Sequence, residues 1–224
     1  MKDVLLIIPA YNEADSLADT VTQVLKYPEY DYVVIDDGST DGTAEIIEQN
    51  GYNHLTHQKN SGLDATFLTG IRYAYREKYR YVVQIDADGQ HDPKYIGRMV
   101  EKADDGYDVV IGSRYLKGQV QNADILRRSG SQLLRWAIYL TTGKNITDPT
   151  SGMRLYNRRA QRFFLTHNGC GPEPDTIAVL MRRGAKVTEA PVMMHDRLAG
   201  KSYLTPRNAI NYMVRELSGI FFKK

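Results

Sequence analysis

The sequence predicts an α/β fold in which helices flank a mostly parallel central sheet. The first observation is a set of short runs rich in β-branched residues, whose continuous apolar character is typical of strands buried on both faces. The second is that each run is followed by a longer amphipathic stretch with helical spacing, which begins near Asp, Ser or Pro. Because this βα rhythm repeats through the first half of the chain, we expect parallel strands with helices on both sides.

Four strands and four helices are expected in the first half. The strands are predicted at residues 4–8, 32–36, 81–86 and 109–111. The helices are predicted between them, at residues 13–26, 43–50, 63–77 and 94–103. Ligands of open parallel sheets bind beyond the carboxyl ends of the strands, so functional side chains are expected just after these strands.

The alternation of strands and helices becomes less regular past about residue 120, but no repeat, charge block or linker marks a domain boundary. The predicted elements are a helix at 124–142, a polar turn at 147–152, a helix at 175–183, a strand at 186–193 and a helix from Pro206. Trp136 and its apolar neighbours are expected to form a buried helix face. We therefore predict one domain over residues 1–224, with a first half (1–115), a second half (116–205) and a C-terminal helix (206–224).

The composition excludes several classes of protein. Of the 224 residues, 42% are hydrophobic and 25% are charged, which excludes a disordered chain. The 29 Lys and Arg against 27 Asp and Glu give a net charge of +2, too small for a protein that coats nucleic acid. Cys170 is the only cysteine, which excludes an internal disulfide and favours a cytoplasmic setting. No apolar run is long enough to span a membrane, so a protein that is soluble or lies on a membrane is expected.

Polar motifs follow the first two predicted strands. The first strand runs into Pro9-Ala-Tyr-Asn-Glu13, and the second into Asp36-Asp-Gly-Ser-Thr-Asp-Gly42. Two adjacent carboxylates at a strand tip, followed by Gly and Ser, place acceptors where a ribose hydroxyl or a base N–H can bind. The same pattern is also typical of a turn in which Asp41 caps the next helix. Both interpretations stay open on the sequence.

A pair of acids follows the strand predicted at 81–86. Asp86 and Asp88 are two residues apart, so on a continuing strand they would share a face. Carboxylate oxygens at a sheet edge suit a hard cation such as Mg²⁺ or Mn²⁺, which keeps open positions for substrate phosphates. Gln90 is a candidate third ligand. His91 and Asp92 are expected to support the ligands or to cap the next helix.

Six motifs together resemble the family 2 glycosyltransferases of the GT-A fold, which is Rossmann-like, and most closely the polyprenyl-phosphate sugar transferases. The motifs are Ile8-Pro-Ala-Tyr-Asn-Glu13, Ile35-Asp-Asp-Gly-Ser-Thr-Asp-Gly42, Asn60-Ser-Gly62, Asp86-Ala-Asp-Gly-Gln-His91, Gly112-Ser-Arg-Tyr115 and Asp148-Pro-Thr-Ser-Gly-Met-Arg154. The resemblance covers nearly the whole chain. It implies that residues 1–115 bind a nucleotide-sugar and that residues 116–205 form the acceptor side.

The resemblance also implies roles for individual residues. Those that would line the nucleoside pocket are Pro9, Tyr11, Glu13, Ile35 and Asp37. Those that would bind the diphosphate and the metal are Asp86, Ala87, Asp88 and Gln90, and Arg114 would contact phosphate. The chain departs from the family where Arg197, Gly200 and Ser202 are followed by Tyr203 instead of Lys, so Lys201 is the nearest cation.

The acceptor decides whether the reaction needs a base. Displacing a nucleoside diphosphate builds charge on the leaving phosphate, which a metal held by Asp86 and Asp88 would neutralise. A sugar hydroxyl as acceptor requires a carboxylate to take its proton, and Glu173 and Asp175 are the candidates. A lipid phosphate is already ionised and needs cations instead. The predicted catalytic residues are therefore Asp88, Arg114 and, for a hydroxyl acceptor, Asp175.

The second half carries candidates for binding an acceptor phosphate. Arginine holds phosphate through a rigid fork of donors, and a solvated basic face is the plain alternative for each residue. Arg114 and Arg197 lie within motifs and are favoured, followed by Arg128. Lys201 is the nearby cation, and Ser131 is a candidate hydroxyl donor or a neutral helix-surface residue. Further cations in this half are Arg127, Arg135 and Arg154.

The C-terminal helix is predicted to be amphipathic. Ile210, Met213, Leu217 and Phe221 fall on one face, with basic residues around it. This face is expected either to lie on an anionic membrane or to pack on the protein or on a second subunit.

The sequence therefore predicts an inverting, metal-dependent hexosyltransferase of cell-envelope glycan synthesis, at the cytoplasmic face of the membrane. The expected donor is UDP-glucose or a related UDP-hexose, with GDP-mannose open, and the expected acceptor is undecaprenyl or dolichyl phosphate. A membrane protein partner or a homo-oligomer is also expected, and no nucleic acid. The rival hypotheses are transfer to a sugar hydroxyl, nucleotidyl transfer and a non-catalytic nucleotide-sugar scaffold.

Overall fold

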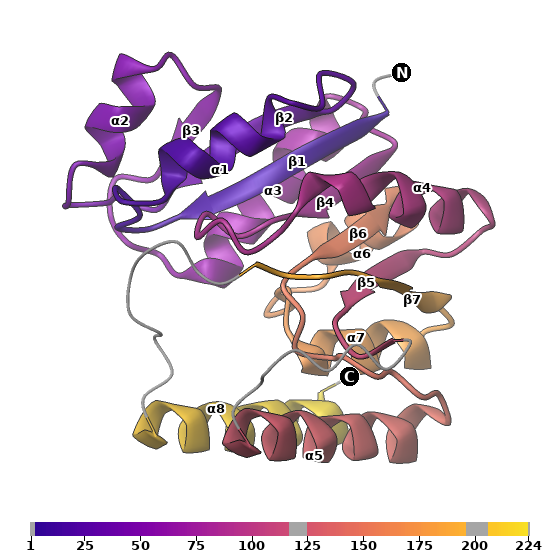
Figure 1. The fold of residues 1–224 in the computed structure, drawn as a ribbon. Helices are drawn as coiled ribbons and strands as arrows, with labels where there is room; N and C mark the ends of the chain where they lie inside the picture. The colour runs from indigo at the N-terminus through magenta and orange to yellow at the C-terminus, as the bar shows by residue number, and fades with distance from the viewer. Residues whose placement is uncertain (1–2, 117–124, 196–205, 224) are drawn as a thin grey trace.

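A seven-stranded sheet forms the centre of the protein (Figure 1). The computed structural model describes residues 3–116, 125–195 and 206–223, with the side chains of all but 125–129 and 206–207. The strands are β1 (Val4–Ala10), β2 (Asp31–Asp36), β3 (His54–Thr56), β4 (Tyr81–Gln84), β5 (Val109–Ser113), β6 (Arg154–Asn157) and β7 (Val187–Pro191). They lie in the order β3-β2-β1-β4-β6-β5-β7.

All of these strands run parallel except β6, which pairs antiparallel with both β4 and β5. Arg154, the first residue of β6, is paired with Gln84 at the end of β4 and with Ile111 of β5. The amino end of β6 therefore lies at the same edge of the sheet as the carboxyl ends of the parallel strands. This edge gathers the polar motifs of both halves of the sequence.

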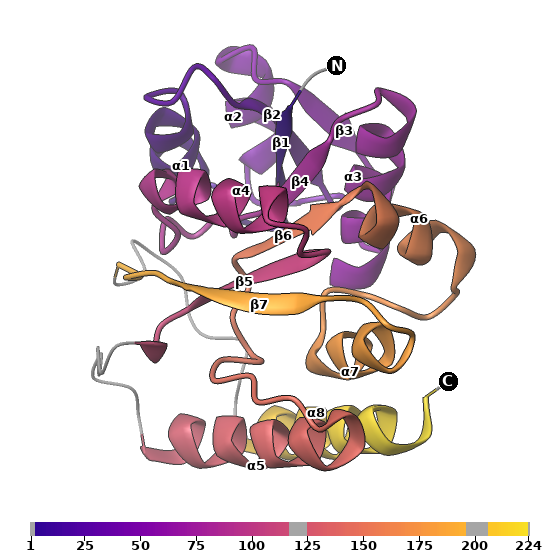
Figure 2. The same cartoon turned by 90° about the vertical axis from the view of Figure 1, so that its right-hand side faces the viewer.

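Helices cover both faces of the sheet (Figures 1 and 2). The helices are α1 (Leu17–Val24), α2 (Thr43–Gln49), α3 (Leu63–Arg76), α4 (Ile96–Asp104), α5 (Ile125–Thr142), α6 (Arg158–Thr166), α7 (Pro174–Arg182) and α8 (Pro206–Phe222), with a 3₁₀ turn, η1, at Pro93–Tyr95. One buried cluster joins α1, α2 and α4 to one face, and the other joins α3, α5, α6, α7 and α8 to the opposite face. Close packing is visible at Gly70 of α3, where an added Cβ would lie 2.8 Å from atoms of Ile7 and Ile35.

The predicted α/β class and most of its elements are confirmed. The apolar runs form β1, β2, β4, β5 and β7, and the amphipathic segments form helices close to their predicted bounds. The N-terminal bound of the first helix was predicted too early, because residues 11–16 form the turns that follow β1. Three elements were not predicted: β3, β6 and α6. Each strand among them has only three or four residues, too few to show a pattern.

Helices α5 and α8 lie side by side beneath α7, on the side away from β1 and α1 (Figures 1 and 2). Trp136 was predicted to be buried, but 56% of it is exposed, because α5 turns Leu134, Ala137 and Ile138 inward instead. The predicted apolar face of α8 is also split: Met213 packs on the core, whereas 66% of Ile210 is exposed. The exposed apolar residues of the two helices are Leu133, Trp136, Tyr139, Leu140, Ile210, Val214, Phe221 and Phe222. We call this set the α5–α8 apolar face.

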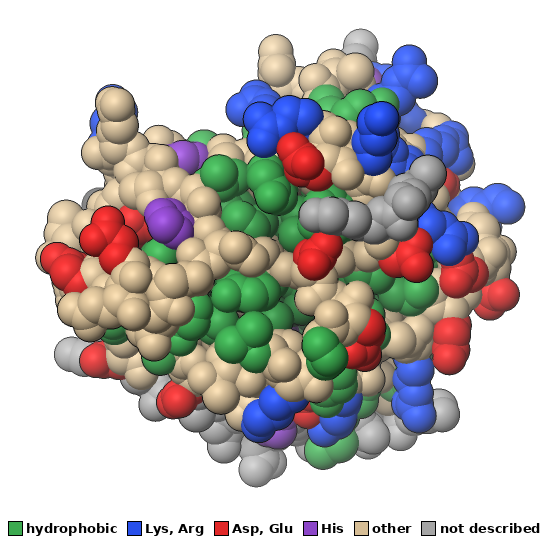
Figure 3. Space-filling model, turned by 90° about the horizontal axis from the view of Figure 1, so that it is seen from above, with side chains coloured by type: hydrophobic (Ala, Val, Ile, Leu, Met, Phe, Trp, Pro, Cys, Tyr) green, Lys and Arg blue, Asp and Glu red, His purple; other side chains and the backbone are tan. Residues whose placement is uncertain are grey.

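Acidic and basic side chains are interspersed on the surface turned away from α5 and α8 (Figure 3). Within the described part of the chain, no helix is both long enough and apolar enough to cross a membrane. The α5–α8 apolar face is therefore a surface feature of two amphipathic helices.

Candidate functional site

Side-chain hydrogen bonds join the turns that follow β1 and β2. Asn12, which has a positive φ of 56°, receives a hydrogen bond from the Thr40 amide at 2.8 Å, and its own amide donates to Ser39 Oγ at 2.9 Å. The Asp41 carboxylate accepts from the amides of Ala14 and Thr43. Burial opposes ionisation of Asp41, but these hydrogen bonds outweigh it and lower its pKa. These hydrogen bonds thus hold the turns after β1 and β2 together.

The carboxylates of the second motif are both buried and bonded. Asp36 Oδ1 accepts from the Ser39 amide at 3.1 Å. Asp37 accepts from the amides of Ser61 and Gly62 and from His57 Nδ1, which lies 2.7 Å away. Both acids therefore shape the strand-tip turns, and Asp37 also holds the segment that leads into α3. Asp41 accepts from the amide of Thr43, the first residue of α2, but the N-cap of that helix is Gly42. The predicted turn is therefore observed, whereas Asp41 is not the N-cap itself.

The residues predicted to line a nucleoside pocket differ in exposure. Tyr11 is exposed and Pro9 is partly exposed at the end of β1. Glu13 accepts from Ser16 Oγ at 2.8 Å, and its amide donates to Thr43 Oγ1. The Ile35 side chain is fully buried beside α3, so the nearby polar surface comes from the turn that follows it. Their roles in binding a nucleoside stay predictions.

The acids after β4 lie in a turn, not on a continuing strand. The strand ends at Gln84, and Gly89 turns the chain with a φ of 77°. Asp86 and Asp88 therefore do not share a strand face: the Asp86 side chain is 41% exposed, whereas Asp88 is buried. Asp88 Oδ1 accepts from the Gln90 amide at 3.1 Å. The prediction that both carboxylates project from a strand was wrong, but both remain at its tip.

The neighbours of these acids fix the turn. His91 Nδ1 accepts from the Asp86 amide at 2.9 Å, so a neutral His91 carries its proton on Nε2, which lies 3.8 Å from Asp86 Oδ2. Ala87, which is buried, accepts from Thr20 Oγ1 of α1 at 2.8 Å. Asp92 accepts from the Lys94 amide and caps η1, as predicted.

Gln90 joins the β4 tip to the segment after β7. Its Nε2 donates to the His195 carbonyl at 3.3 Å, and the His195 amide donates to the Gln90 carbonyl at 2.9 Å. Within the described residues the Gln90 amide oxygen has no hydrogen bond, so it can bind another partner. Arg197 and Lys201 follow in the sequence and lie outside the described residues.

The chemistry of the donors at this tip fits a hard divalent cation. Asp86 and Asp88 supply carboxylate oxygens and Gln90 an amide oxygen, the ligand atoms that Mg²⁺ and Mn²⁺ prefer. Among the described residues, no three His, Cys, Asp or Glu side chains group as a metal site. A site with two carboxylates would therefore complete its coordination with the amide, water and substrate phosphates.

A loop of residues 147–152, here called the 147–152 loop, crosses this edge of the sheet. Glu189 of β7 accepts from the amides of Thr147 and Asp148, each at 2.8 Å. Asp148 is fully buried and accepts from Arg114 Nε at 2.7 Å and Nη2 at 2.8 Å. Burial disfavours the charged form of Arg114, but the hydrogen bonds and the charge of Asp148 outweigh it and raise its pKa. Arg114 is therefore a fixed cation.

The 147–152 loop brings Arg114 and Asp86 to the same place. An added Cβ at Gly152 would lie 2.7 Å from Asp86 Oδ2, so the loop backbone packs directly on that carboxylate. The charge of Asp86 is also one of the causes that raise the Arg114 pKa. The carboxyl ends of β4 and β5 thus carry a carboxylate and a guanidinium at one site.

Arg154 is buried and holds the 147–152 loop in place. It is therefore not a surface cation on the acceptor side. The residue is 1% exposed, and it donates from Nε to the Ser151 carbonyl at 2.8 Å and from Nη2 to the Pro149 carbonyl at 2.7 Å. Its Nη1 is buried with no hydrogen-bond partner in the described structure. The basic-surface interpretation of Arg154 was therefore wrong.

Both candidate bases face α8. Asp175 Oδ2 lies 2.8 Å from Lys223 Nζ, and the Asp175 amide donates to Glu216 Oε2 at 3.2 Å. Glu173 accepts from Tyr212 Oη at 2.9 Å, and burial raises its pKa. No described hydrogen bond or ion pair joins either carboxylate to Asp86, Asp88 or Arg114. Their role as a base stays a prediction.

The remaining acceptor-phosphate candidates are only partly described. Ser131 is buried in α5, so it is not the exposed helix-surface residue of the alternative interpretation. Arg128 belongs to α5, but its side chain is among those not described. Their phosphate contacts, like those of Arg197 and Lys201, stay predictions.

Comparison with known proteins identifies the family. The family model described as glycosyl transferase family 2 matches residues 5–164, more than half of the chain. The protein belongs to glycosyl transferase family 2. It is therefore a glycosyltransferase, and the resemblance seen in its motifs is confirmed.

Two relatives of this glycosyltransferase have named activities. It is 31% identical over 217 residues to an undecaprenyl-phosphate mannosyltransferase of Micrococcus luteus, covering 90% of this chain and 87% of that one. It is 32% identical over 216 residues to a polyprenol monophosphomannose synthase of Mycolicibacterium smegmatis, covering 91% and 82%.

Two solved structures share the fold of this glycosyltransferase. A Pyrobaculum calidifontis mannosyltransferase in complex with GDP-Man and Mn²⁺ matches with a TM-score of 0.68 at 17% identity, over 99% of this chain and 64% of that chain. A glucosyl-3-phosphoglycerate synthase of Mycobacterium tuberculosis, in complex with Mn²⁺, UDP and phosphoglyceric acid, matches with a TM-score of 0.71 at 14% identity, over 96% and 78%. The fold is therefore the GT-A fold predicted from the motifs.

Sequence reasoning missed the residues that hold this glycosyltransferase's site together. Glu189 lies within a predicted strand and carries no motif, so nothing in the sequence marks it as the acceptor for the 147–152 loop. Asp148 lies in one of the six motifs, but nothing in the sequence pairs it with Arg114. Their contact depends on β6, which places the 147–152 loop beside β5.

Replacing Glu216 with Gln is expected to stabilise this glycosyltransferase above neutral pH. Burial first, and then the charges of Glu173 and Asp175, raise the Glu216 pKa to about 7 from an ordinary value of 4.5. The folded form therefore binds this proton more tightly than the unfolded form does. The resulting contribution to the free energy of unfolding is complete below about pH 4.5 and is lost as the pH rises through about 7. At pH 8, Glu216→Gln should recover at most about 3 kcal/mol of unfolding free energy.

Urea unfolding at pH 5 and pH 8 checks this expectation. Glu48→Gln, the same change at an exposed position of α2, should alter neither value. An equal effect of Glu216→Gln at both pH values would contradict the assigned titration.

Proposed function

We propose that this protein transfers a hexose from a nucleotide-sugar to a polyprenyl phosphate, with inversion at the anomeric carbon. The observation that carries the proposal is the placement of Asp86 and Arg114 at one sheet edge by the 147–152 loop. The names of the two relatives, which act on undecaprenyl phosphate and polyprenol, support the lipid phosphate as acceptor.

The carboxyl ends of β4 and β5 suit a leaving diphosphate. Asp86, Asp88 and Gln90 would hold Mg²⁺ or Mn²⁺, which when bound supplies positive charge to the departing phosphate oxygens. Arg114 stays ionised because Asp148 pairs with it, and its remaining N–H groups can face an anion. The crystals of both structural relatives contain Mn²⁺, which supports this cofactor.

A phosphate acceptor needs no general base in this protein. Its oxygen is already ionised, so it can attack the anomeric carbon while the carbon–oxygen bond to the diphosphate breaks on the opposite face. Asp175 is paired with Lys223, and Glu173 is bonded to Tyr212, so both candidate bases have other partners. This pairing favours lipid phosphate over a sugar hydroxyl.

The nucleoside is expected at the tips of β1 and β2, beside Tyr11 and Asp37. A UDP-hexose is the donor expected from the resemblance to bacterial family members, whereas the two relatives described above carry mannose in their names. Mannose donors and UDP-hexoses therefore both belong in the assay.

The α5–α8 apolar face fits an anionic membrane surface. The segment 125–142 contains three arginines and no acidic residue, and the only acidic residue of α8, Glu216, is buried. Exposed Trp and Tyr beside basic side chains are typical of helices that lie in a membrane interface. We place the protein at the cytoplasmic face of the membrane, where a polyprenyl phosphate is available.

The acceptor can be tested with purified protein. Labelled sugar from UDP-hexoses or GDP-mannose should appear on a short-chain polyprenyl phosphate in the presence of Mn²⁺, and not on a free glycan. Asp175→Asn should leave kcat for the lipid within a fewfold of the wild type, because no proton is removed there.

Two outcomes would contradict this assignment. Labelling of the glycan alone, with a loss of about 100-fold or more in Asp175→Asn, would identify a hydroxyl acceptor and a general base. Nucleotide-sugar binding without any turnover would favour the scaffold hypothesis, and pyrophosphate release from a nucleoside triphosphate would favour nucleotidyl transfer.

The metal site can be tested by Gly152→Ala. The new methyl group would meet Asp86 Oδ2 at 2.7 Å, so the carboxylate must turn away. We expect Mn²⁺ affinity, measured by electron paramagnetic resonance, to fall about tenfold or more. Gly97→Ala, whose Cβ meets nothing closer than 3.8 Å, serves as the control and should bind Mn²⁺ normally. Unchanged Mn²⁺ binding in Gly152→Ala would remove Asp86 from the ligand set.

Membrane association can be tested by sedimentation with vesicles. The wild type should bind vesicles rich in phosphatidylglycerol, and Trp136→Glu should weaken that binding about tenfold, because an inserted aromatic ring is lost. Leu25→Glu is the matched control: Leu25 is also 56% exposed, but it lies at the end of α1. Equal losses in both variants would argue against the α5–α8 apolar face.

A further inference from the structure

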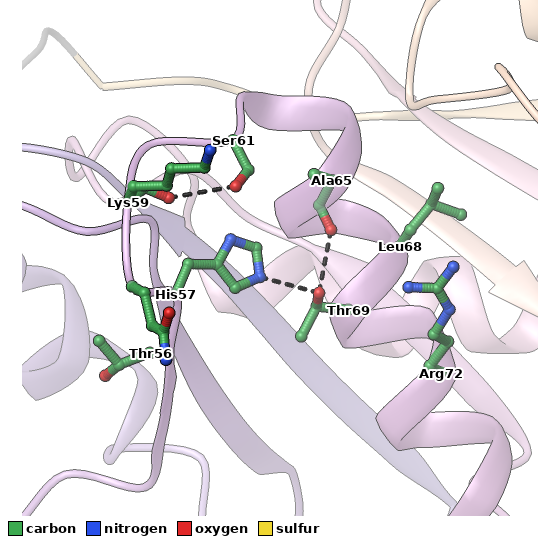
Figure 4. A pocket seen from close by; sticks show the side chains of 9 residues that line it. Thr56, His57, Lys59, Ser61, Ala65, Leu68, Thr69 and Arg72 are labelled. Atoms are coloured by element: carbon green, nitrogen blue, oxygen red, sulfur yellow. Dashed lines mark hydrogen bonds between the residues drawn. The ribbon is translucent and has the colours of Figure 1, made fainter.

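His57 connects Asp37 to helix α3 through a chain of hydrogen bonds. The residue follows β3 directly, and its amide continues the ladder to the Asp36 carbonyl at 2.8 Å. On one side its Nδ1 lies 2.7 Å from Asp37 Oδ1, and on the other its Nε2 lies 2.9 Å from Thr69 Oγ1. Figure 4 shows the imidazole ring pointing from the strand toward α3.

One hydrogen of this chain can be assigned from its acceptor. Asp37 Oδ1 accepts from backbone amides as a carboxylate, so His57 Nδ1 must donate to it. On the other side of the ring, the Thr69 hydroxyl lies within hydrogen-bond distance of both His57 Nε2, at 2.9 Å, and the Ala65 carbonyl, at 3.0 Å. The ring is therefore held at both of its nitrogens.

Among the described residues, the His57 ring is the only side chain that donates to the Asp37 carboxylate. The other donors are the amides of Ser61, at 3.0 and 3.1 Å, and of Gly62, at 2.8 Å. A carboxylate offers about four lone-pair sites, so these contacts fix its orientation. Since Asp37 is buried, the loss of the His57 donor would free the carboxylate to turn.

His57 also lines an open cavity of about 730 Å³ between residues 56–61 and α3 (Figure 4). Lys59 and Arg72 line the same cavity, and its lining contains no acidic side chain. The ring therefore bonds to Asp37 and also borders a cavity that carries these two cations.

We infer that His57 is a positioning residue, which fixes Asp37 and the 59–62 segment in the geometry that receives the nucleoside of the donor. The inference rests on the proposed function, because it is that function that places a nucleoside beside Asp37. His57 acts through Asp37 and takes no part in the chemical step. Its loss therefore affects donor binding more than turnover.

Two substitutions test the two ring nitrogens of His57 separately. In His57→Asn the amide nitrogen takes the place of Nδ1 and can still donate to Asp37, whereas in His57→Gln it takes the place of Nε2 and reaches Thr69. We expect the Kd for UDP or GDP with Mn²⁺ to rise about tenfold or more in His57→Gln, and only a fewfold in His57→Asn. The KM for the donor should follow these changes, with kcat little altered.

His54→Asn provides the matched control. His54 lies three residues earlier, on β3, and is exposed; in the part of the chain that the structure describes, its ring bonds only to the Tyr52 carbonyl. This variant should bind nucleotide like the wild type. Circular dichroism and melting temperatures show whether each variant is folded, so that a loss of binding is not confused with unfolding.

The protonation of the His57 ring can be measured directly by NMR. In ¹⁵N-histidine-labelled protein, Nδ1 of His57 should show a protonated chemical shift at the assay pH, and the His57→Asn spectrum assigns the signal. An unprotonated Nδ1 would overturn the inference, and so would equal Kd values for His57→Gln and His57→Asn. Failure of the wild type to bind any nucleoside diphosphate would instead overturn the proposed function.

Discussion

The buried ion pair between Arg114 and Asp148 holds the functional edge of the sheet together. A fully buried carboxylate is costly unless it is paired and hydrogen-bonded, and Asp148 is both, through the fork of Arg114. Glu189 orients the same loop from β7, and Arg154 supports it from below. The position of Gly152 against Asp86 follows from these contacts. The place where charge develops in the proposed reaction is thus set by residues outside the metal site.

The parallel part of the fold could be predicted from the sequence, and the antiparallel strand could not. The runs that form β1 and β4 are buried on both faces, and such strands show in sequence as continuous apolar residues. Strand β6 has four residues and begins with Arg154, which looks like a surface cation in sequence. Its burial depends on pairing with β4, about 70 residues away, and no local pattern encodes that contact.

The site was predictable as a set of strand tips, but not in its side-chain geometry. Asp37 and Asp86 were proposed because parallel strands deliver their ends to one edge, and Arg114 was proposed through the family resemblance. The shared face expected for Asp86 and Asp88 is absent because the chain leaves the strand before them and turns at Gly89. Trp136 shows a related limit: helical periodicity reveals an apolar stripe, but it does not say which of two stripes faces the core.

Helix α8 packs Met213, Leu217 and Ile220 on the core, and its outer surface also carries apolar residues. Its buried Glu216 lies against Asp175, whose carboxylate is paired with Lys223, while 80% of Phe222 is exposed. Hydrophobic burial explains the core-facing residues of α8 but not the exposed ones, which turning the helix could bury only by exposing Ile220. An apolar environment outside the protein would cover Phe222 without breaking the ion pair between Asp175 and Lys223. This arrangement supports the membrane association proposed above.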